Sequence, residues 1–414
     1  MREGWEVKKL GQVSNVQRGL TYGRNDTVDI SENIVLRATN IKLESNSLDF
    51  NDLKYLTDDF EIKDIYKLKV GSLLICFSSG SKNHLGKVAI VEEPYAAAFG
   101  GFIGQITPNE IVIPRYLFYN LISDNYRKYI SELTDGMNIN NLKSGDLKQF
   151  PIPIPPIQEQ KQIVKILDQA FTAIDQAKAN IEKNIVNAKE LFQSKLNAIF
   201  SQKGDGWKEK SIDEISKVVN GYSFKSKDFS ADNEIKSIKI TNVGIMEFVE
   251  DSSNNLPLSF LQEYSKVQVH VGDLVLALTR TIISGGLKVA RVPESYHNSL
   301  LNQRVAAIVP NLSLVNSDYL YYYFSSDIVY NYVLSNVNTL MQPNLSIKDL
   351  KRMTIPITSL EGQRKISIQI EGLSEKTNLL ISNYEVKLNN IEELKKSILQ
   401  KAFSGELTQK EVVV

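Results

Sequence analysis

The chain has 414 residues, which is too long for one compact core and favours two or more domains. Its 48 basic and 48 acidic residues cancel, so it lacks the basic excess that is typical of a protein binding DNA unaided. The single cysteine, Cys76, excludes an internal disulfide, and the absence of a signal peptide or a long apolar run predicts a soluble cytoplasmic protein.

Residues 1–154 contain short strand-like runs separated by glycine and proline, followed by one helical pattern. The runs are LKVGSLLICF (68–77), GKVAIVE (86–92) and FIGQITP (102–108). The segment PRYLFYNLISDNYRKYI (114–130) has the apolar spacing of one amphipathic helix. This mixture predicts an α+β domain.

A proline run, FPIPIPPIQEQKQI (150–163), precedes a long stretch without a helix breaker. Apolar residues then recur at steps of three and four from Ile163 to Ile199, which predicts one long helix with an apolar stripe. We expect Pro156 at the first helical position and Glu159 in the first turn. The prolines then form a stiff hinge between domain and helix, the alternative being a generic proline-rich linker.

The second half of the chain repeats the first at an offset of 201 to 204 positions. Trp5 recurs as Trp207, Asn141 as Asn344, and Lys87-Val88-Ala89 as Lys288-Val289-Ala290. The strand-like runs and the helical pattern return as VQVHVGDLVLALT (267–279), KVARV (288–292), RVAAIVP (304–310) and SDYLYYYFSSDIVYNYV (317–333).

The repeat predicts two similar domains, each followed by a long helix: residues 1–154, 155–203, 204–357 and 358–414, the last with a C-terminal tail. Thr358 and Glu361 have the spacing of a capping box at the second long helix. We expect the tyrosines of 319–323 to be core residues, although base stacking is an alternative.

Each long helix needs a partner, because one helix of about 65 Å cannot bury its stripe alone. The second helix has a matching stripe, and the connectivity favours an antiparallel coiled coil with pseudo-two-fold symmetry. Two similar mixed α/β heads at opposite ends of a rigid spacer would fit a bipartite DNA site.

On these features the sequence closely resembles the specificity (S) subunit of type I restriction–modification systems. The resemblance rests on the tandem halves, the phrases IPIPPIQEQKQI and IPITSLEGQRKI, and the endings LNAIFS and LQKAFSGEL. It implies target recognition domains that each read half of a split DNA sequence. It also implies helices that set the spacer and dock two methyltransferase (M) subunits using S-adenosylmethionine, joined by restriction and translocase (R) subunits. Gly362 replaces Glu159 in the second phrase, a position on which we expect little to depend.

No catalytic role is expected for the chain itself. It contains neither an NPPY-type tetrad nor a glycine-rich cofactor loop, and its three histidines lack metal-ligand spacing, so we expect no cofactor and no metal. Partner subunits would supply the missing positive charge. Two rival interpretations remain: the recognition chain of a type IIB/IIG-like enzyme, and a helical adaptor without a DNA role.

The two halves can be compared with each other to find DNA-binding candidates. Positions that differ while the surrounding frame is kept are candidates for base readout, and CFSSGSKNHLGKVA against ALTRTIISGGLKVA is the clearest case. Arg280 could bond guanine, and Lys82 and Asn83 could address guanine and adenine. An ordinary polar loop is the alternative. The candidates here are Ser78, Ser79, Ser81, Lys82, Asn83, Thr279, Arg280, Thr281 and Ser284.

Three further segments supply candidates. In LRATNIK and IKITNVG, Arg37 and Lys239 suit phosphate contacts, whereas the shared Asn40 and Asn242 could be readout residues or structural turns. In the segment around residue 20, a glycine beside an aromatic residue could let the backbone approach DNA. In the segment around residue 140, side-chain amides could read adenine or cap the next helix. These segments contribute Gly19, Thr21, Tyr22, Arg24, Lys225, Asn138, Asn140, Gln342 and Asn344.

Overall fold

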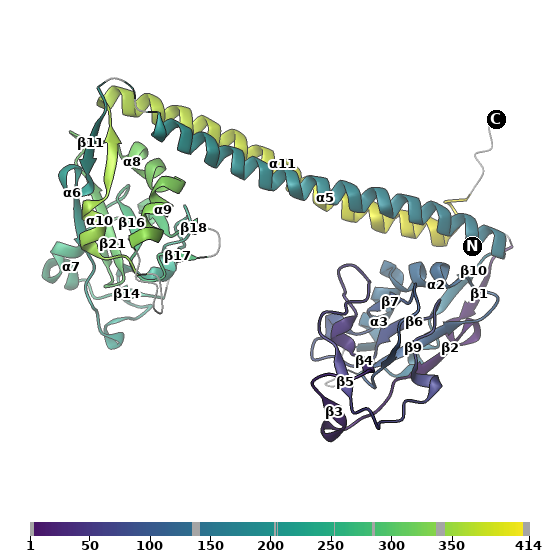
Figure 1. Ribbon diagram of the computed structural model, residues 1–414. Helices are drawn as coiled ribbons and strands as arrows, with labels where there is room; N and C mark the ends of the chain where they lie inside the picture. Colours follow the sequence, from purple (N-terminus) through teal and green to yellow (C-terminus); the bar gives the residue numbers. More distant parts are fainter. Residues whose placement is uncertain are drawn as a thin grey trace, which may run out of the picture. The chain divides into compact units, whose positions relative to one another are not determined.

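The computed structural model describes residues 4–134, 141–202, 204, 206–251, 253–283, 286–336 and 344–408. The chain forms two compact units, one of Met1–Ile181 with Val386–Val414 and one of Glu182–Glu385. Each unit holds a strand-rich head and about half of each of two long helices, α5 (Ile157–Ser201) and α11 (Leu360–Ser404) (Figure 1). We call residues 4–154 head 1 and residues 206–357 head 2. The units therefore cut both helices, whereas the predicted domains kept each helix whole.

Head 1 is built on two four-stranded sheets and one two-stranded sheet, with strand orders β2-β9-β6-β7, β3-β5-β4-β8 and β1-β10. Its strands are β1 (Glu6–Lys9), β2 (Ser14–Arg18), β3 (Thr27–Val28), β4 (Asn33–Leu36), β5 (Lys54–Leu56), β6 (Leu73–Cys76), β7 (Val88–Ile90), β8 (Ala97–Phe99), β9 (Ile103–Pro108) and β10 (Pro151–Ile154). Its helices are α1 (Leu10–Val13), α2 (Pro114–Leu121), α3 (Asp124–Thr134), α4 (Ser144–Leu147) and the 3-10 turns η1 (Arg24–Asp26), η2 (Ala38–Asn40), η3 (Asp64–Tyr66) and η4 (Lys82–His84).

Head 2 repeats this plan with sheets β12-β21-β16-β19, β14-β13-β20-β15 and β11-β22, and adds a β17-β18 pair. Its strands are β11 (Lys208–Ser211), β12 (Ser216–Asn220), β13 (Ile235–Ile238), β14 (Asn255–Leu256), β15 (Gln268–Val269), β16 (Leu274–Ala277), β17 (Ile282–Ile283), β18 (Gly286–Leu287), β19 (Val289–Arg291), β20 (Ser299–Leu301), β21 (Val305–Pro310) and β22 (Thr354–Ile357). Its helices are α6 (Ile212–Ile215), α7 (Phe260–Glu263), α8 (Ser317–Phe324), α9 (Asp327–Asn336), α10 (Ile347–Arg352) and the 3-10 turns η5 (Ser226–Asp228), η6 (Ile240–Asn242), η7 (Ser265–Val267) and η8 (Glu294–Tyr296).

The prediction of one helix over 114–130 was wrong, because the segment forms two helices, α2 and α3. Ser123 ends the first and begins the second: its hydroxyl donates to the carbonyl of Asn120 at 2.7 Å and accepts from the amide of Tyr126 at 3.4 Å. Serine competes in this way with the helical backbone. The break recurs in head 2 between α8 and α9, and the second helix of each pair still contributes to the core, with Tyr126 in head 1 and Val329 in head 2.

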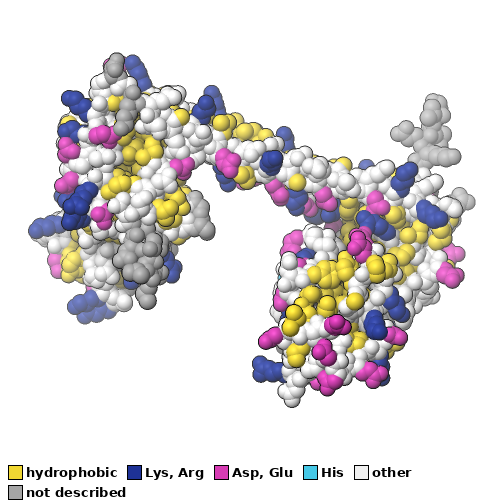
Figure 2. Space-filling view, viewed as in Figure 1, with side chains coloured by type: hydrophobic (Ala, Val, Ile, Leu, Met, Phe, Trp, Pro, Cys, Tyr) yellow, Lys and Arg dark blue, Asp and Glu magenta, His cyan; other side chains and the backbone are white. Residues whose placement is uncertain are grey.

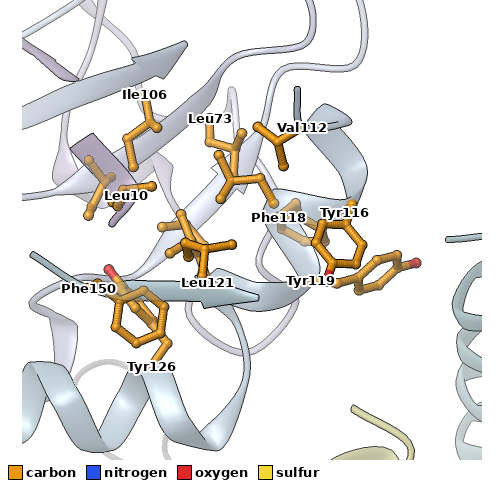
Figure 3. Packing of buried hydrophobic residues seen from close by; sticks show 14 of the residues in the cluster. Leu10, Leu73, Ile106, Val112, Tyr116, Phe118, Tyr119, Leu121, Tyr126 and Phe150 are labelled. Atoms are coloured by element: carbon orange, nitrogen blue, oxygen red, sulfur yellow. The ribbon is translucent and has the colours of Figure 1, made fainter. Parts of the chain in front are cut away.

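The core of head 1 lies between the β2-β9-β6-β7 sheet and the helices α2 and α3. Leu73 and Ile106 from the sheet meet Tyr116, Leu121 and Tyr126 from the helices, all fully or almost fully buried (Figure 3). Burying such side chains contributes about 1.5–3 kcal/mol each. Head 2 has its own cluster, in which Leu276 of β16 packs with Tyr319 of α8 and Val329 of α9. The two heads therefore have separate cores, and the predicted α+β class is confirmed.

The long helices pack antiparallel within each unit, as predicted (Figure 1). In unit 1 the beginning of α5 lies beside the end of α11, where Lys178 and Glu392 form an ion pair at 2.9 Å and Lys395 lies over the Phe171 ring. In unit 2 the end of α5, with Leu196 and Phe200, shares a core cluster with Ile370 near the beginning of α11. Each helix has 45 residues, about 68 Å at 1.5 Å per residue.

Each head packs through a matching aromatic pair against the long helix that belongs to the other sequence repeat. Tyr116 in head 1 packs edge-on against Phe403 of α11, with ring centroids 5.6 Å apart, and Tyr319 in head 2 packs against Phe200 of α5 at 5.2 Å. Both tyrosine hydroxyls donate to a proline carbonyl at 2.7 Å. Burial raises the pKa of both hydroxyls. Tyr319, Tyr322 and Tyr323 are buried and Tyr321 is half-buried, so the prediction that these tyrosines are core residues is confirmed for three of the four.

The proline run forms an edge strand as well as a hinge. β10 pairs antiparallel with β1, so that Pro151 lies opposite Lys9 and Pro153 opposite Val7, and β22 pairs with β11 in the same way. Proline is tolerated in such two-stranded edges because one side of the strand needs no donor. The helix starts differ slightly from prediction: Pro156 precedes the first helical residue, and Ser359 rather than Thr358 accepts the amide of Gly362 at 3.1 Å.

A buried glutamine in each repeated phrase fastens helix to head. The side-chain oxygen of Gln160 accepts the amide of Ile113 at 2.8 Å, and its amino group donates to the carbonyls of Ile111 and Pro155, both at 2.9 Å. Gln363 makes the equivalent bonds to Asn316, Leu314 and Thr358. Both glutamines are 0% exposed. Each repeated phrase therefore supplies a buried glutamine whose hydrogen bonds hold the long helix to the head, and we call this set of bonds the latch.

Glu159 has a larger role than the sequence suggested. One carboxylate oxygen accepts the indole N–H of Trp5 at 3.1 Å, and the other accepts the hydroxyl of Thr408, beyond the end of α11, at 2.5 Å. Gly362 occupies the equivalent place in unit 2 and cannot make these bonds. The expectation that little depends on this position is therefore wrong for unit 1.

Candidate nucleic-acid interface

The strand order of head 1 brings the predicted segments to one edge of the main sheet. β2 and β6 flank β9 and run antiparallel to it, with Arg18 opposite Gly104 and Cys76 opposite Ile103. The carboxyl ends of β2 and β6 therefore lie beside the start of β9. The segments that follow these strands, 19–24 and 77–84, begin at this edge.

The second sheet of head 1 ends at the same place. β4 and β8 are parallel, with Leu36 opposite Phe99, so Arg37 and Gly100 leave their strands side by side. The turn Gly100–Ile103 then leads directly into β9. We call the surface formed by residues 19–24, 37, 78–84, 100–102 and 141 the strand-end face of head 1. Head 2 has an equivalent strand-end face, formed by residues 221–226, 239, 279–283, 302–304 and 344, because β12, β16, β21, β13 and β20 follow the same pairing.

Backbone contacts join the first and fourth predicted segments in both heads. In head 1 Ser78 forms a β-bridge with Asn141, and in head 2 Thr279 forms one with Asn344. The amide of Leu142 donates to the carbonyl of Phe77 at 2.7 Å, which holds the two segments in register. Asn344 is exposed at this junction. Asn138, Asn140, Ser284 and Gln342 lie outside the described residues.

Glycine at position 19 is required by internal packing. A Cβ atom there would lie 2.3 Å from the carbonyl oxygen of Gly100, and one at Gly221 would lie 2.0 Å from that of Asn302. The β-bridges Leu20–Gly100 and Tyr222–Asn302 produce this close approach. Internal packing therefore explains the glycine at this position, and an approach of its backbone to DNA stays a prediction.

Thr21, Tyr22 and Arg37 meet at one concave site, although they come from different predicted segments. The site has a volume of about 250 Å³ and is lined by Leu20, Thr21, Tyr22, Arg37, Gly100, Gly101 and Phe102. Burial raises the pKa of the Tyr22 hydroxyl, which keeps it protonated and able to donate a hydrogen bond. Arg24 is exposed just beyond this site, in η1, where its structural counterpart is Ser226 rather than Lys225.

The two loops of equal length adopt different structures. In head 1, residues 82–84 form η4, and Arg127 from α3 donates to the carbonyls of Asn83 and Leu85 at 2.7 and 2.9 Å. Ser81, Lys82 and Asn83 are exposed, and Ser78 and Ser79 are half-buried. In head 2 the described part of the loop forms the β17–β18 pair.

Arg280 is the exposed residue at the start of the head 2 loop. It adopts a left-handed backbone with φ of 50°, and its guanidinium has no hydrogen-bond or ion-pair partner in the described chain. Burial and the neighbouring Arg280 lower the pKa of Lys288, so the two cations favour an anionic ligand. Thr279 is half-buried, whereas Thr281 is fully buried and is ruled out as a DNA contact.

Asn40 and Asn242 are structural residues, which corrects their place among the DNA contacts. They are 1% and 0% exposed. The side-chain oxygen of Asn40 accepts the amide of Arg37 at 2.8 Å, and its amino group donates to the carbonyls of Asp49 and Asp52. Asn242 bonds the amide of Lys239 and the carbonyl of Val249 in the same geometry, both at 2.8 Å.

The basic side chains of the two faces divide into those with an internal partner and those without. Arg37 is paired with Asp52 at 2.7 Å, and Lys239 donates to Asn254 and lies 3.6 Å from the Phe229 ring centroid. Burial lowers the pKa of Lys239. Among the described residues, no hydrogen-bond, ion-pair or ring partner exists for the exposed charges of Arg24, Lys82, Lys225, Arg280 and Arg304.

Comparison of the two halves missed Asn141, Phe102 and Arg304 on these faces, and Arg18 beside them. The Arg18 guanidinium lies 4.5 Å from the Phe77 ring centroid and donates to Asn141 at 3.3 Å. Phe102 and Arg304 occupy equivalent turns, which were assigned to strand-like runs. The same comparison could have found them, because GGFIGQITP (100–108) and NQRVAAIVP (302–310) keep the same length and closing strand but differ in their first three residues.

Neither metal-binding clusters nor membrane spans were found where the structure is described. None of the described helices is long and apolar enough to cross a bilayer, and no group of three or more His, Cys, Asp or Glu residues could hold a metal ion there. Basic and acidic side chains are interspersed over both heads and the long helices on the face that Figure 2 presents. The side of the molecule drawn in Figure 2 therefore has no uniform basic patch.

Comparison with known proteins gives one family over most of the chain. A family model described as "Type I restriction modification DNA specificity domain" matches residues 2–186 and again 204–392. The EcoKI specificity subunit of a type I restriction enzyme, from Escherichia coli strain K12, is 28% identical over 98% of this chain and 90% of its own length. A putative type I specificity subunit, MjaX of Methanocaldococcus jannaschii, is 28% identical over 99% and 95%.

Solved structures share the fold at lower identity. A chain from a study of complex assembly and conformational transition of the type I R-M system has a TM-score of 0.76 at 16% identity, covering 98% of this chain and 99% of its own. The HsdS subunit from Thermoanaerobacter tengcongensis has a TM-score of 0.58 at 17% identity, with 98% of each chain covered.

Proposed function

The chain belongs to the family of type I restriction modification DNA specificity domains, of which it holds two copies, and from this premise we propose how its two heads work. Each strand-end face reads one half of a split DNA sequence, and the paired helices set the spacer between the halves. The chain itself performs no catalysis.

One observation carries this proposal: the same face is built twice, with different side chains at matched positions. The frame residues, including the buried Asn40 and Asn242, are shared, whereas exposed side chains at matched positions differ, as with Phe102 and Arg304. A fixed frame with variable contacts is what two readers of different sequences require. Base-edge contacts from Arg, Asn and Lys can then specify each half.

We further propose that two methyltransferase subunits using S-adenosylmethionine dock on the long helices, and that restriction and translocase subunits join that core. Apolar side chains remain exposed on these helices, at 52% for Val186 and 58% for Leu191 of α5, and at 64% for Leu379 of α11. Exposed apolar residues on a helix already paired with another helix favour protein partners. The host DNA places this assembly in the cytoplasm.

Methylation-aware sequencing of host DNA, with and without the gene, tests the function. We expect a split motif that disappears when the gene is deleted. Replacing residues 1–150 by another head should change one half of that motif and leave the other half intact. A motif in which both halves change together, or an assembled complex without sequence preference, would contradict the two-reader proposal.

A further inference from the structure

Phe102 and Arg304 occupy the same position in the two heads. Each is the third residue of a β-turn that leads into the central strand: Ile103 donates to Gly100 at 2.9 Å, and Val305 donates to Asn302 at 2.9 Å. The Phe102 side chain is 69% exposed, and Arg304 is also exposed. The backbone is alike and the side chains are chemically different.

The backbone at this position is held firmly. The carbonyl of Phe102 accepts the amides of Phe77 and Ser78 at 2.9 and 3.1 Å, and the carbonyl of Arg304 accepts the amide of Leu278 at 2.9 Å. These amides belong to the first residues of the loops that contain Lys82 and Arg280. The turn therefore presents its side chain from a rigid support, as a recognition residue requires.

The turn of head 1 lies at the meeting point of the other segments of its strand-end face. A Cβ atom on Gly100 would be 3.4 Å from the Tyr22 ring, and one on Gly101 would be 3.6 Å from the Thr21 hydroxyl. Phe102 lines the concave site with these residues and with Arg37. On the other side, Ser78 links the turn to Asn141.

Neither Phe102 nor Arg304 has a side-chain partner among the described residues of its own head. A single exposed apolar residue is ordinary, but Phe102 makes no ring contact with the described residues and stands among polar and basic groups that suit DNA. The Arg304 guanidinium likewise has no internal partner in the described ranges, in contrast to Arg37, which is paired with Asp52. Both side chains are free for an external contact.

We propose that position 102/304 determines specificity in each half-site, an inference that rests on the proposed DNA-reading function. Phe102 packs against the methyl group of a thymine, because this methyl is the apolar group on base edges of an intact duplex. Arg304 donates two hydrogen bonds to a guanine, the contact that its planar guanidinium favours. Head 1 therefore specifies an A·T pair at this position and head 2 a G·C pair.

The test measures the methylated motif of the assembled complex for Phe102→Ala and Arg304→Ala. F102A should weaken discrimination at one A·T pair of one half-site by about 4-fold, the effect of one methyl group losing its apolar contact, with the other half unchanged. R304A should weaken discrimination for a guanine in the opposite half by about 5- to 100-fold. Phe102→Leu keeps an apolar contact and should keep the motif, which separates the contact from general damage to the head.

Leu312→Ala is the matched control, because Leu312 is 68% exposed and lies beyond the other end of β21. It should leave both half-sites and the melting temperature unchanged. If the wild type shows a split motif but F102A and R304A keep both halves at full discrimination, this inference is wrong while the proposed function stands. If the wild type shows no split motif, the proposed function itself fails.

Discussion

Residues of one type have opposite roles on the strand-end faces, and burial separates them. Asn40 and Asn141 are both asparagines near the same edge, but Asn40 is almost fully buried and bonds three backbone groups, whereas Asn141 is exposed. Arg37 and Arg304 are both arginines, yet only Arg37 has an internal carboxylate partner. Residue type alone makes both members of each pair candidates for DNA contacts. Burial and internal bonds then show which member already has a structural role.

Asn40→Ala should destabilise head 1 without changing what it reads. The substitution leaves one amide and two carbonyls without their partner, which costs about 2–3 kcal/mol. The melting temperature should fall by about 5–10 °C. Asn83→Ala removes an exposed amide from the same face and should leave the melting temperature unchanged. A stable N40A protein with an altered motif would show that Asn40 contacts DNA.

Arg280→Asn should alter the half-site read by head 2 only. Asparagine tolerates the left-handed backbone at this position, so the change removes the guanidinium without adding strain. We expect discrimination at one position to weaken by about 1–3 kcal/mol, as measured by methylation of single-mismatch sites. Arg24→Ala removes an exposed guanidinium from head 1 and should affect the other half. An intact motif in R280N would exclude this role.

At the scale of elements, the junction between head and helix is the feature that the sequence encodes most explicitly. A buried tyrosine, a proline-containing edge strand and a buried glutamine recur in this order in both units. Each contributes hydrogen bonds that cannot be formed with solvent once the junction is buried. The angle between helix and head is thus fixed by specific bonds as well as by apolar packing.

Gln160→Glu should make the stability of unit 1 depend on pH. The new carboxyl would be fully buried and would face two carbonyl oxygens, so its pKa would rise above the unfolded value of about 4.3. A raised pKa means that the folded state prefers the protonated form. The variant should therefore approach wild-type stability near pH 4 and lose it as the pH rises towards 7.

Thermal unfolding of Q160E at pH 4, 5 and 7, each relative to wild type, measures this effect. Gln162→Glu lies on the exposed side of α5 and serves as the control, with no pH-dependent difference expected. Equal behaviour of the two variants would show that the latch contributes little.

Elements with strong periodicity were predictable from the sequence, and short polar segments were not. The long helices and the main strands follow from apolar spacing, which depends on local geometry. The break at Ser123 depends on one hydroxyl, and the carbonyls of the 82–85 segment are bonded by Arg127, which has no arginine counterpart in head 2. The loops of the candidate faces were named from the sequence, but the turns with Phe102 and Arg304 were not, because they resembled strand ends.

For the whole molecule, the repeat gives two heads that are separate from each other and that share the same two long helices. Each head keeps its own core and its own strand-end face, so it can change its contacts independently of the other. Both heads nevertheless depend on the same two helices, because α5 and α11 each contribute to both units. The heads thus vary while the helices stay constant.

Removing seven residues from each helix, 181–187 and 383–389, should shorten the spacer of the DNA motif. Seven residues are nearly two turns, so the apolar stripes stay within about 20° of their phase. The loss of about 10 Å corresponds to roughly three base-pair steps. Both half-sites should be retained in the sequenced motif. A deletion in only one helix is the control and should abolish assembly, whereas an unchanged spacer would contradict the ruler role.

The bonds of Glu159 give the chain a built-in optical reporter. The chain has two tryptophans, and Trp5 is 7% exposed, with its indole bonded to the same carboxylate that holds Thr408. Detachment of this C-terminal segment would admit water to the indole and shift its emission to longer wavelength. Trp207, without a carboxylate at the equivalent place, supplies a reference signal, so docking of the chain end can be followed in solution without any added label.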